Sequence, residues 1–241
     1  MGDAFTVGQE VQPAELSMLR DDNGVMTVAG FGSLLSERSS RRTFPDLRNF
    51  RIGRVTGFRR VFAHVAPIFF ETGIARMETM EISSLSCEPW DEGSIVVSLF
   101  EVDCSNQADL DAFVEREHEF RFVVVQPQPL APSAEPPRLA VLCARYSDEE
   151  YKAARCPPGE FHRRYGRHGI DRVWRDDVFP CRTYLRHCVL AAERLGQEAY
   201  DSFMDSTFLA DRETTVREWL RRNPDIMAEE PPPELAERYG G

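Results

Sequence analysis

Residues 28–35, VAGFGSLL, form an apolar strand that runs directly into a turn containing Gly30 and Gly32. Glycine lets the backbone bend sharply and approach a ligand without interference from a Cβ, and consecutive N–H groups in such a turn can point at an anion. The dinucleotide fingerprint GxGxxG fails because Leu35 stands where the third glycine belongs, and neither a Walker loop nor a GxSxG elbow is present. The segment is therefore a candidate binding loop, although taken alone an ordinary glycine turn is the commoner case.

Composition excludes several broad classes. The 241 residues carry a net charge of −11, with 42% hydrophobic and 29% charged residues, which is too apolar for global disorder. No run reaches the roughly 18 uncharged apolar residues of a membrane span. The start MGDAFTVGQE lacks a secretory pattern, and the six cysteines contain no CxxC pair. We therefore expect a cytoplasmic monomer or homodimer with reduced thiols that does not bind membranes.

The pattern of elements predicts an α+β fold class. Segments rich in Val, Phe and Ile predict strands at 25–31, 53–65, 73–80, 94–102, 119–125 and 138–146. One helix interrupts them over 106–117, with Ser105 as its expected N-cap and Leu110 and Phe113 on its buried face. Helical patterns follow near 147–155, 180–195, 197–209 and 213–222.

Domain organisation follows from the absence of a linker between the β-rich part, 25–146, and the helical part, 147–222. We predict one domain over 25–222, a flexible segment over 1–24 and an acidic Pro-rich tail over 223–241. The Pro-rich stretches 127–137 and 229–233 should lack regular structure, because proline removes a backbone donor. The apolar residues of the extension predict that it docks on the β-rich part and walls off part of the pocket.

Helical phase selects one candidate acid. Residues seven apart nearly superimpose on a helix, so Glu117 falls on the face of Leu110, whereas Glu115 lies about 140° away and should face water. A carboxylate aimed inward can have a raised pKa and move protons near neutral pH. Glu119 and Glu115 remain alternatives, and a solvated helix end is the ordinary interpretation of a lone glutamate.

Other polar groups indicate less. The five histidines have no metal-ligand spacing, and Cys181 and Cys188 are more simply packed thiols than a redox pair. Eight arginines and one acid, Asp46, occupy residues 38–60. The acidity of the chain and the lack of interleaved aromatics argue against a nucleic-acid groove. A solvated basic face is the simplest interpretation, and attraction of a carboxylate-bearing substrate is the next.

Three motifs together resemble the gamma-glutamylcyclotransferase superfamily, and their spacing is closest to its glutathione-degrading ChaC-type branch. They are GFGSLL (30–35), GFRRVF (57–62) and LDAFVEREHEFRFVVV (110–125), which cover about residues 25–146. Residues 184–212 also resemble the helical extension of a plant and algal branch. Phe31 stands where the family usually has tyrosine.

The resemblance implies a mixed β-barrel or sheet with flanking helices. It also implies a reaction without metal or cofactor, in which the amino group of a γ-glutamyl compound attacks its own γ-carbonyl and releases 5-oxoproline. Glu117 would be the catalytic acid and base, and Gly30, Phe31, Gly32, Ser33, Leu34 and Leu35 would bind the substrate. Glutathione is the leading candidate, followed by γ-glutamyl amino acids and amines. A binding or interaction protein that keeps the fold without turnover is the alternative.

Overall fold

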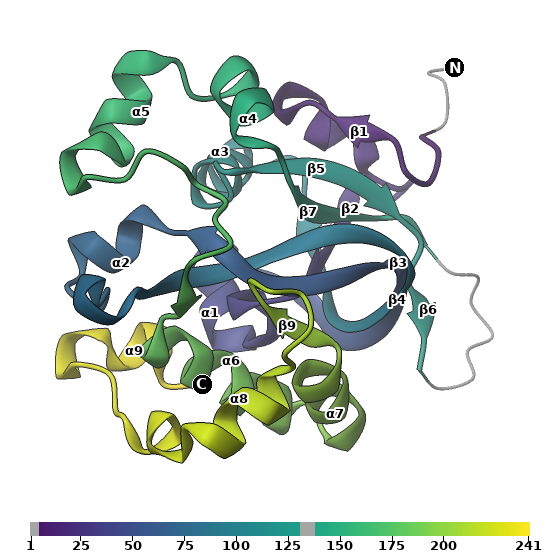
Figure 1. Cartoon of the computed structure of the whole chain (residues 1–241). Coiled ribbons are helices and arrows are strands. Elements are labelled where there is room, and N and C mark those ends of the chain that lie inside the picture. Colours follow the sequence, from purple (N-terminus) through teal and green to yellow (C-terminus); the bar gives the residue numbers. More distant parts are fainter. Residues whose placement is uncertain (1–4, 131–137) are drawn as a thin grey trace.

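The computed structural model of the chain describes residues 5–130 and 138–241. Its strands are β1 (Glu10–Val11), β2 (Val25–Gly30), β3 (Arg48–Val65), β4 (Glu81–Asp103), β5 (Phe120–Val125), β6 (Gln128–Pro129), β7 (Ala140–Arg145), β8 (Phe179–Pro180) and β9 (Thr207–Leu209). They form a sheet in the order β1-β5-β7-β2-β4-β3-β6, with β8 paired to β4 and β9 to β3 (Figure 1). The β2–β7, β3–β9 and β4–β8 pairs are parallel and the others are antiparallel, so the sheet is mixed.

Helices flank this sheet on two sides (Figure 1). They are α1 (Glu37–Arg41), α2 (Pro67–Glu71), α3 (Gln107–Arg116), α4 (Asp148–Ala154), α5 (Pro158–Arg164), α6 (Arg182–Arg194), α7 (Gln197–Asp205), α8 (Val216–Arg222) and α9 (Ala236–Tyr239). Short 3-10 turns are η1 (Pro13–Leu19), η2 (Ser33–Leu35), η3 (Met77–Thr79), η4 (Gly166–His168), η5 (Pro224–Ala228) and η6 (Pro233–Leu235). Helices α6 to α9 gather on one side, and α4 and α5 lie on the other. The predicted α+β fold class is confirmed.

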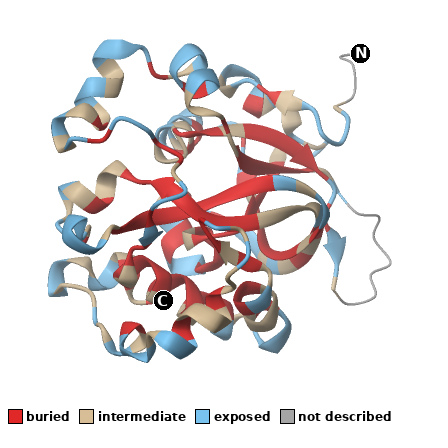
Figure 2. Cartoon of the chain, viewed as in Figure 1, coloured by how far each residue is buried: buried red, intermediate tan, exposed pale blue. Residues whose placement is uncertain are grey.

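The core lies between the sheet and the C-terminal helices. Figure 2 shows the central strands and the inner faces of these helices as mostly buried. Leu185 of α6 and Phe203 of α7 are fully buried in the same apolar cluster as Phe62 of β3 and Phe100 of β4. The helical extension therefore packs directly on the β-rich part. Each part would expose its apolar surface to water without the other.

One predicted strand is wrong. Residues 73–80 contain η3, and both Gly73 and Met80 have positive φ values, of 71° and 56°, which end extended structure. The strand begins instead at Glu81 and continues through the Ser-rich residues 81–93 as the first half of β4. Hydrophobic alternation misses this half because its buried side chains include the small polar residues Ser83 and Ser86.

Two helix boundaries also differ from the prediction. The N-cap of α3 is Asn106 and not Ser105, since the Asn106 side chain accepts a hydrogen bond from the N–H of Asp109 at 3.4 Å. The predicted helix 197–209 ends at Asp205, and the following residues form β9, which pairs with β3. Backbone pairing with an available sheet edge outweighs the helical pattern there.

The two ends of the chain are more structured than predicted. Within the expected flexible segment, β1 pairs with β5, and Val11 and Leu16 are buried. The Pro-rich tail contains η5, η6 and α9, because proline suits the first turn of a short helix and because Ile226 and Tyr239 find buried positions. The other Pro-rich stretch, 127–137, contains β6, and its residues 131–137 lie outside the described residues.

Along residues 5–130 and 138–241, none of the helices combines the length and apolar character that crossing a membrane requires.

A buried arginine joins the extension to the sheet. Arg60 of β3 is fully buried, and its guanidinium donates to the Ser202 carbonyl at 3.3 Å, to Thr207 Oγ1 at 3.4 Å and to the Val96 carbonyl. The Arg60 guanidinium carbon also lies 5.4 Å from the centre of the Phe203 ring. Burial lowers the pKa of Arg60 to about 10. Its hydrogen bonds therefore offset a substantial desolvation cost.

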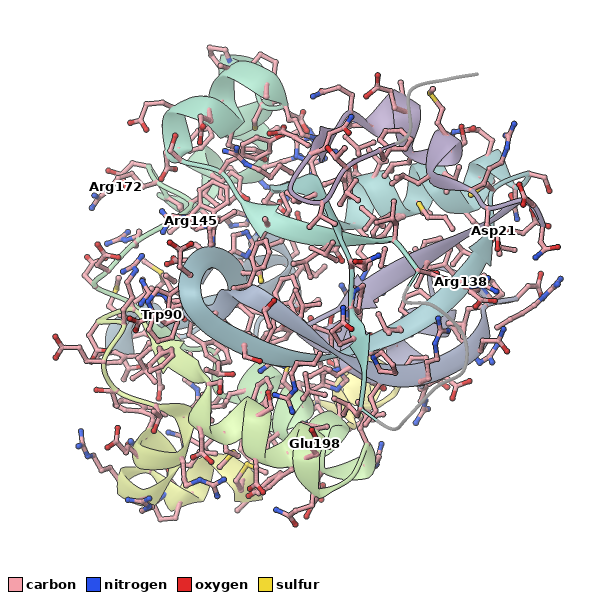
Figure 3. The ribbon with its side chains drawn as sticks, turned by 90° about the vertical axis from the view of Figure 1, so that its right-hand side faces the viewer. Asp21, Trp90, Arg138, Arg145, Arg172 and Glu198 are labelled. Carbon is pink, nitrogen blue, oxygen red and sulfur yellow. The ribbon has the colours of Figure 1, made fainter. Side chains whose placement is uncertain are left out.

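We predict that Arg60→Ala lowers the free energy of unfolding in urea by about 3–5 kcal/mol, the range for disrupting a buried charged network. The matched control is Arg54→Ala, also on β3, whose partner Glu198 on α7 is labelled in Figure 3. The Arg54 and Glu198 side chains are 36% and 52% exposed, so this change should cost at most about 1 kcal/mol. Equal losses in the two variants would contradict a special role for Arg60.

Candidate functional site

The glycine loop after β2 borders a cavity of about 480 Å³. Of the six predicted binding residues, Phe31, Gly32, Ser33 and Leu34 line this cavity, whereas Gly30 and Leu35 are not among its lining residues. Gly30 has a packing role, because a Cβ there would lie 2.4 Å from Leu34 Cβ and 2.6 Å from Ser98 Oγ. The first glycine thus allows the loop to fold back on the strand, and the next residues form the cavity wall.

Of the four backbone amides of residues 32–35, those of Ser33 and Leu35 are engaged within the protein. The Leu35 N–H donates to the Gly32 carbonyl at 2.9 Å, and the Ser33 N–H donates to the Tyr184 hydroxyl at 3.3 Å. A Cβ at Gly32 would lie 2.7 Å from that hydroxyl oxygen. Gly32 therefore permits α6 to bring Tyr184 against the loop. The amides of Gly32 and Leu34 remain as the candidates in this segment for binding a ligand.

The end of α3 fixes the backbone of the candidate acid. The Glu117 N–H still makes a helical bond to the Phe113 carbonyl at 2.9 Å, although Glu117 itself is the C-cap. Arg155, which follows α4, donates to the carbonyls of Val114 and Phe120, each at 2.9 Å. The last carbonyls of a helix lack hydrogen-bond donors within the helix. Arg155 supplies donors at this end of α3 and so holds the turn that carries Glu117.

The Glu117 side chain lines the cavity and is 12% exposed. Burial raises the pKa of its carboxyl above the ordinary value, and the adjacent Arg116 partly opposes that shift, with Nε 3.3 Å from Glu117 Oε1. The Arg116 guanidinium also donates to Ser33 Oγ and Thr43 Oγ1, each at 2.9 Å. One largely buried cation therefore connects the acid, the glycine loop and Thr43, two residues after the end of α1.

The two alternative acids differ sharply in environment. Glu119 is 6% exposed, lines the same cavity and accepts a hydrogen bond from the Tyr165 hydroxyl at 3.0 Å. Burial raises the pKa of Glu119 to about 7. The Glu115 side chain is 65% exposed and pairs with Arg164 at 2.6 Å. Glu115 also lines the cavity, but it is far more exposed than Glu117, and Glu119 is a second buried carboxyl.

Aromatic and imidazole groups form the apolar side of the cavity. The Phe31 and Phe120 rings meet edge to face at 6.2 Å, and the His64 ring lies 4.9 Å from Phe120. His64 is 3% exposed, and neither of its ring nitrogens has a hydrogen-bond partner among the described residues. Burial and then Arg145 lower the pKa of His64 to about 3, so the ring is neutral at pH 7. No spacing in the sequence singles His64 out.

The C-terminal part of the chain supplies a further wall, consisting of Tyr184, Arg238 and Tyr239. Tyr239 is 2% exposed, and its ring lies 6.4 Å from Phe69 and 6.5 Å from Tyr184. The tail is held in place partly by the Gly241 N–H, which donates to His187 Nδ1 at 3.0 Å. The sequence interpretation missed Arg238 and Tyr239, because their Pro- and Glu-rich surroundings are typical of a solvated tail.

The cysteines and the arginines singled out in the sequence do not gather into a second site. All six cysteines are buried free thiols. The arginines of residues 38–60 do not share one face, since Arg60 is buried, Arg54 pairs with Glu198 on α7 and Arg42 lines the cavity. In the part of the chain that the structure describes, no three His, Cys, Asp or Glu side chains are grouped to hold a metal ion.

Comparison with known proteins gives only distant structural likeness. No protein-family model and no curated protein matches this sequence. A gamma-glutamyl cyclotransferase specific to glutathione from yeast is similar at 12% identity, with 86% of this chain and 96% of that chain covered and a TM-score of 0.45. Another structure, described as a gamma-glutamyl cyclotransferase, is 12% identical, with 58% and 85% covered and a TM-score of 0.37. A human protein described as uncharacterized is 13% identical, with 51% and 68% covered and a TM-score of 0.39. At these values the likeness does not establish what this chain does.

The raised pKa of Glu119 predicts a pH-dependent stability. The folded protein favours the neutral carboxyl, whose pKa moves from 4.5 to about 7, so the stabilising contribution is present below pH 4.5 and is lost as the pH rises toward 7. This shift corresponds to about 3 kcal/mol. Glu119→Gln keeps a neutral acceptor for Tyr165 and should remove that part of the pH dependence.

Chemical denaturation of both proteins between pH 5 and pH 8 measures the effect. Relative to the variant, the wild-type protein should lose about 3 kcal/mol across this range. Glu115→Gln is the matched control and should keep the wild-type slope, because its side chain is 65% exposed. Parallel curves for the wild type and Glu119→Gln would show that Glu119 titrates in the folded protein as it does in the unfolded chain.

Proposed function

We propose that this protein is a γ-glutamylcyclotransferase that needs no cofactor and releases 5-oxoproline from a γ-glutamyl substrate, with glutathione or a γ-glutamyl amino acid as the leading candidates. One observation carries the proposal: Glu117, a largely buried carboxyl with a raised pKa, lines a 480 Å³ cavity together with the glycine loop. The three sequence motifs that resemble the superfamily include the same loop and the same acid.

The reaction moves protons and exchanges one C–N bond for another. The α-amino nitrogen of the substrate attacks its own γ-carbonyl carbon, the lactam bond forms, and the bond to the leaving amine breaks. The Glu117 carboxylate accepts a proton as the ammonium becomes the attacking amine, and a second proton leaves the same nitrogen when the lactam forms. Both protons end on the leaving amine, which departs as an ammonium, so no net oxidation occurs and no water is consumed. A pKa raised toward the working pH suits both halves of this transfer.

Orientation supplies much of the rate in an intramolecular reaction, where effective molarities reach on the order of 10⁵–10⁸ M. The Arg116 contacts to Ser33 and Glu117 fix the acid relative to the loop. The Tyr184 hydroxyl accepts a hydrogen bond from the Ser33 N–H, which holds α6 against the loop. Burial raises the pKa of Tyr184 well above its usual value, so this hydroxyl remains protonated at neutral pH.

The second buried carboxyl is assigned a different role. Glu119 has one oxygen engaged by the Tyr165 hydroxyl, whereas Glu117 lies against Arg116 at the loop. We therefore assign proton transfer to Glu117 and regard Glu119 as part of the cavity wall.

The direct experiment is to incubate the purified protein with glutathione, γ-glutamyl dipeptides and γ-glutamyl amines and to measure 5-oxoproline. Formation of 5-oxoproline in proportion to enzyme concentration is the expected result. If no member of the panel yields product while at least one binds in calorimetry, the fold serves ligand binding without turnover, and the enzymatic proposal is wrong.

Glu117→Gln keeps the shape of the side chain but cannot accept the ammonium proton. We expect kcat to fall by about 10²–10⁴-fold, as is typical for loss of a general acid or base, while the melting temperature stays within a few degrees. Glu115→Gln is the matched control from the exposed face of the same helix and should retain activity. Full activity in Glu117→Gln together with loss in Glu119→Gln would transfer the role to Glu119.

A further inference from the structure

The cavity carries an uneven distribution of positive charge. On the α5 side, Arg163 and Arg164 are neutralised by two acids, because both make ion pairs with Glu160 at 2.5 Å and Arg164 also pairs with Glu115 at 2.6 Å. On the side of α1 and α9, Arg42 and Arg238 line the cavity. The two walls therefore differ in how much cationic charge is left to meet a ligand.

Arg238 has no ion-pair partner within residues 5–130 and 138–241, and its guanidinium carbon lies 5.5 Å from the centre of the Tyr239 ring. The only carboxylate paired with Arg42 among these residues is Glu237, at 4.0 Å, and the Glu237 side chain is 77% exposed. An exposed pair at that distance is worth little. Arg42 and Arg238 are therefore available to a carboxylate that enters the cavity.

The position of this pair along the cavity indicates which part of a substrate it meets. The reacting amine and carbonyl must lie at Glu117, whose side chain is 12% exposed, whereas the Arg42 side chain is 48% exposed. The glutamyl half must occupy the buried end to react, so the leaving half extends toward the exposed mouth.

The positive charge of Arg238 also acts on Arg116, deeper in the cavity. The positive charge of Arg238 contributes to the lowered pKa of Arg116, although burial is the larger cause. Neighbouring cations repel each other, so both are stabilised by an anion between or beside them. Arg116 itself is occupied by Ser33, Ser39, Thr43 and Glu117, which leaves Arg42 and Arg238 as the cations free to bind.

We propose that Arg42 and Arg238 bind a carboxylate on the leaving half of the substrate, so that the enzyme prefers γ-glutamyl peptides and γ-glutamyl amino acids over γ-glutamyl amines. This inference rests on the proposed cyclotransferase function and names its substrate class. It also gives the C-terminal tail a direct part in recognition, since Arg238 belongs to α9. Arginine suits this task because its planar guanidinium matches a carboxylate with two parallel hydrogen bonds.

The test compares γ-glutamylglycine with γ-glutamylglycinamide, which differ only in the terminal carboxylate. For the wild type we expect kcat/KM to be about 10- to 100-fold higher for the acid, as for a charge-assisted hydrogen bond. Arg238→Gln and Arg42→Gln should each lower kcat/KM for the acid more than for the amide and so reduce that preference. Raising the ionic strength should also reduce the preference, because the arginines are partly exposed.

Arg38→Gln is the matched control. Arg38 lies on α1, which Arg42 caps, and it also approaches Glu237, at 3.7 Å, but it is not among the cavity-lining residues. It should keep the wild-type preference for the acid. Melting temperatures of all three variants check that each remains folded.

The outcomes separate this inference from the proposed function. Equal turnover of acid and amide by the wild type, or a preference that survives Arg238→Gln and Arg42→Gln, overturns the carboxylate site and leaves the cyclotransferase assignment standing. If neither these compounds nor glutathione yields 5-oxoproline, the cyclotransferase assignment fails, and calorimetry of the same two compounds decides the binding inference. Tighter binding of the acid that disappears in Arg238→Gln supports the carboxylate site, and equal or absent binding overturns it.

Discussion

The Arg116 guanidinium is the interaction on which the arrangement of the cavity depends. It lies against the Glu117 carboxyl and donates to Ser33, Ser39 and Thr43, so α3, the glycine loop and the region of α1 meet at one buried cation. A guanidinium offers five donors in a fixed plane, which a lysine cannot reproduce. Loss of the Arg116 guanidinium would remove the contact that links Glu117 to the glycine loop.

The same interaction imposes a compromise on the acid. Burial raises the pKa of Glu117, and Arg116 limits the rise, so the two effects act on the carboxyl in opposite directions. Burying carboxyls such as Glu117 and Glu119 costs stability. The extensive packing between the sheet and the C-terminal helices, including buried Arg60, offsets that cost elsewhere in the fold.

The sequence predicted the features that depend on local periodicity. Helical phase separated Glu117 from Glu115 because the Glu117 amide still makes a helical bond, although α3 ends one residue earlier. The α+β fold class followed from short apolar strands and later helical patterns. The Ser-rich half of β4 escaped prediction, because small polar side chains buried in a sheet break the usual alternation.

Features created by tertiary contact were beyond prediction. The tail places Arg238 and Tyr239 in the cavity wall through contacts with residues far away in sequence, such as Phe69. The local composition of the tail does not predict those contacts, and its proline content indicated a solvated tail. The engagement of the Ser33 N–H by Tyr184 is likewise a meeting of residues 151 positions apart.

The most direct test of the central claim, that burial prepares Glu117 for proton transfer, is the titration of its carboxyl in the folded protein. Carbon NMR of protein labelled at glutamate side chains, with the Glu117 signal assigned by its loss in Glu117→Gln, measures the midpoint. We expect a midpoint above the ordinary value of 4.5, and a further rise when Arg116 is replaced by glutamine. A midpoint at or below 4.5 would contradict the claim, because the carboxyl would then be a stable anion with little tendency to carry a proton.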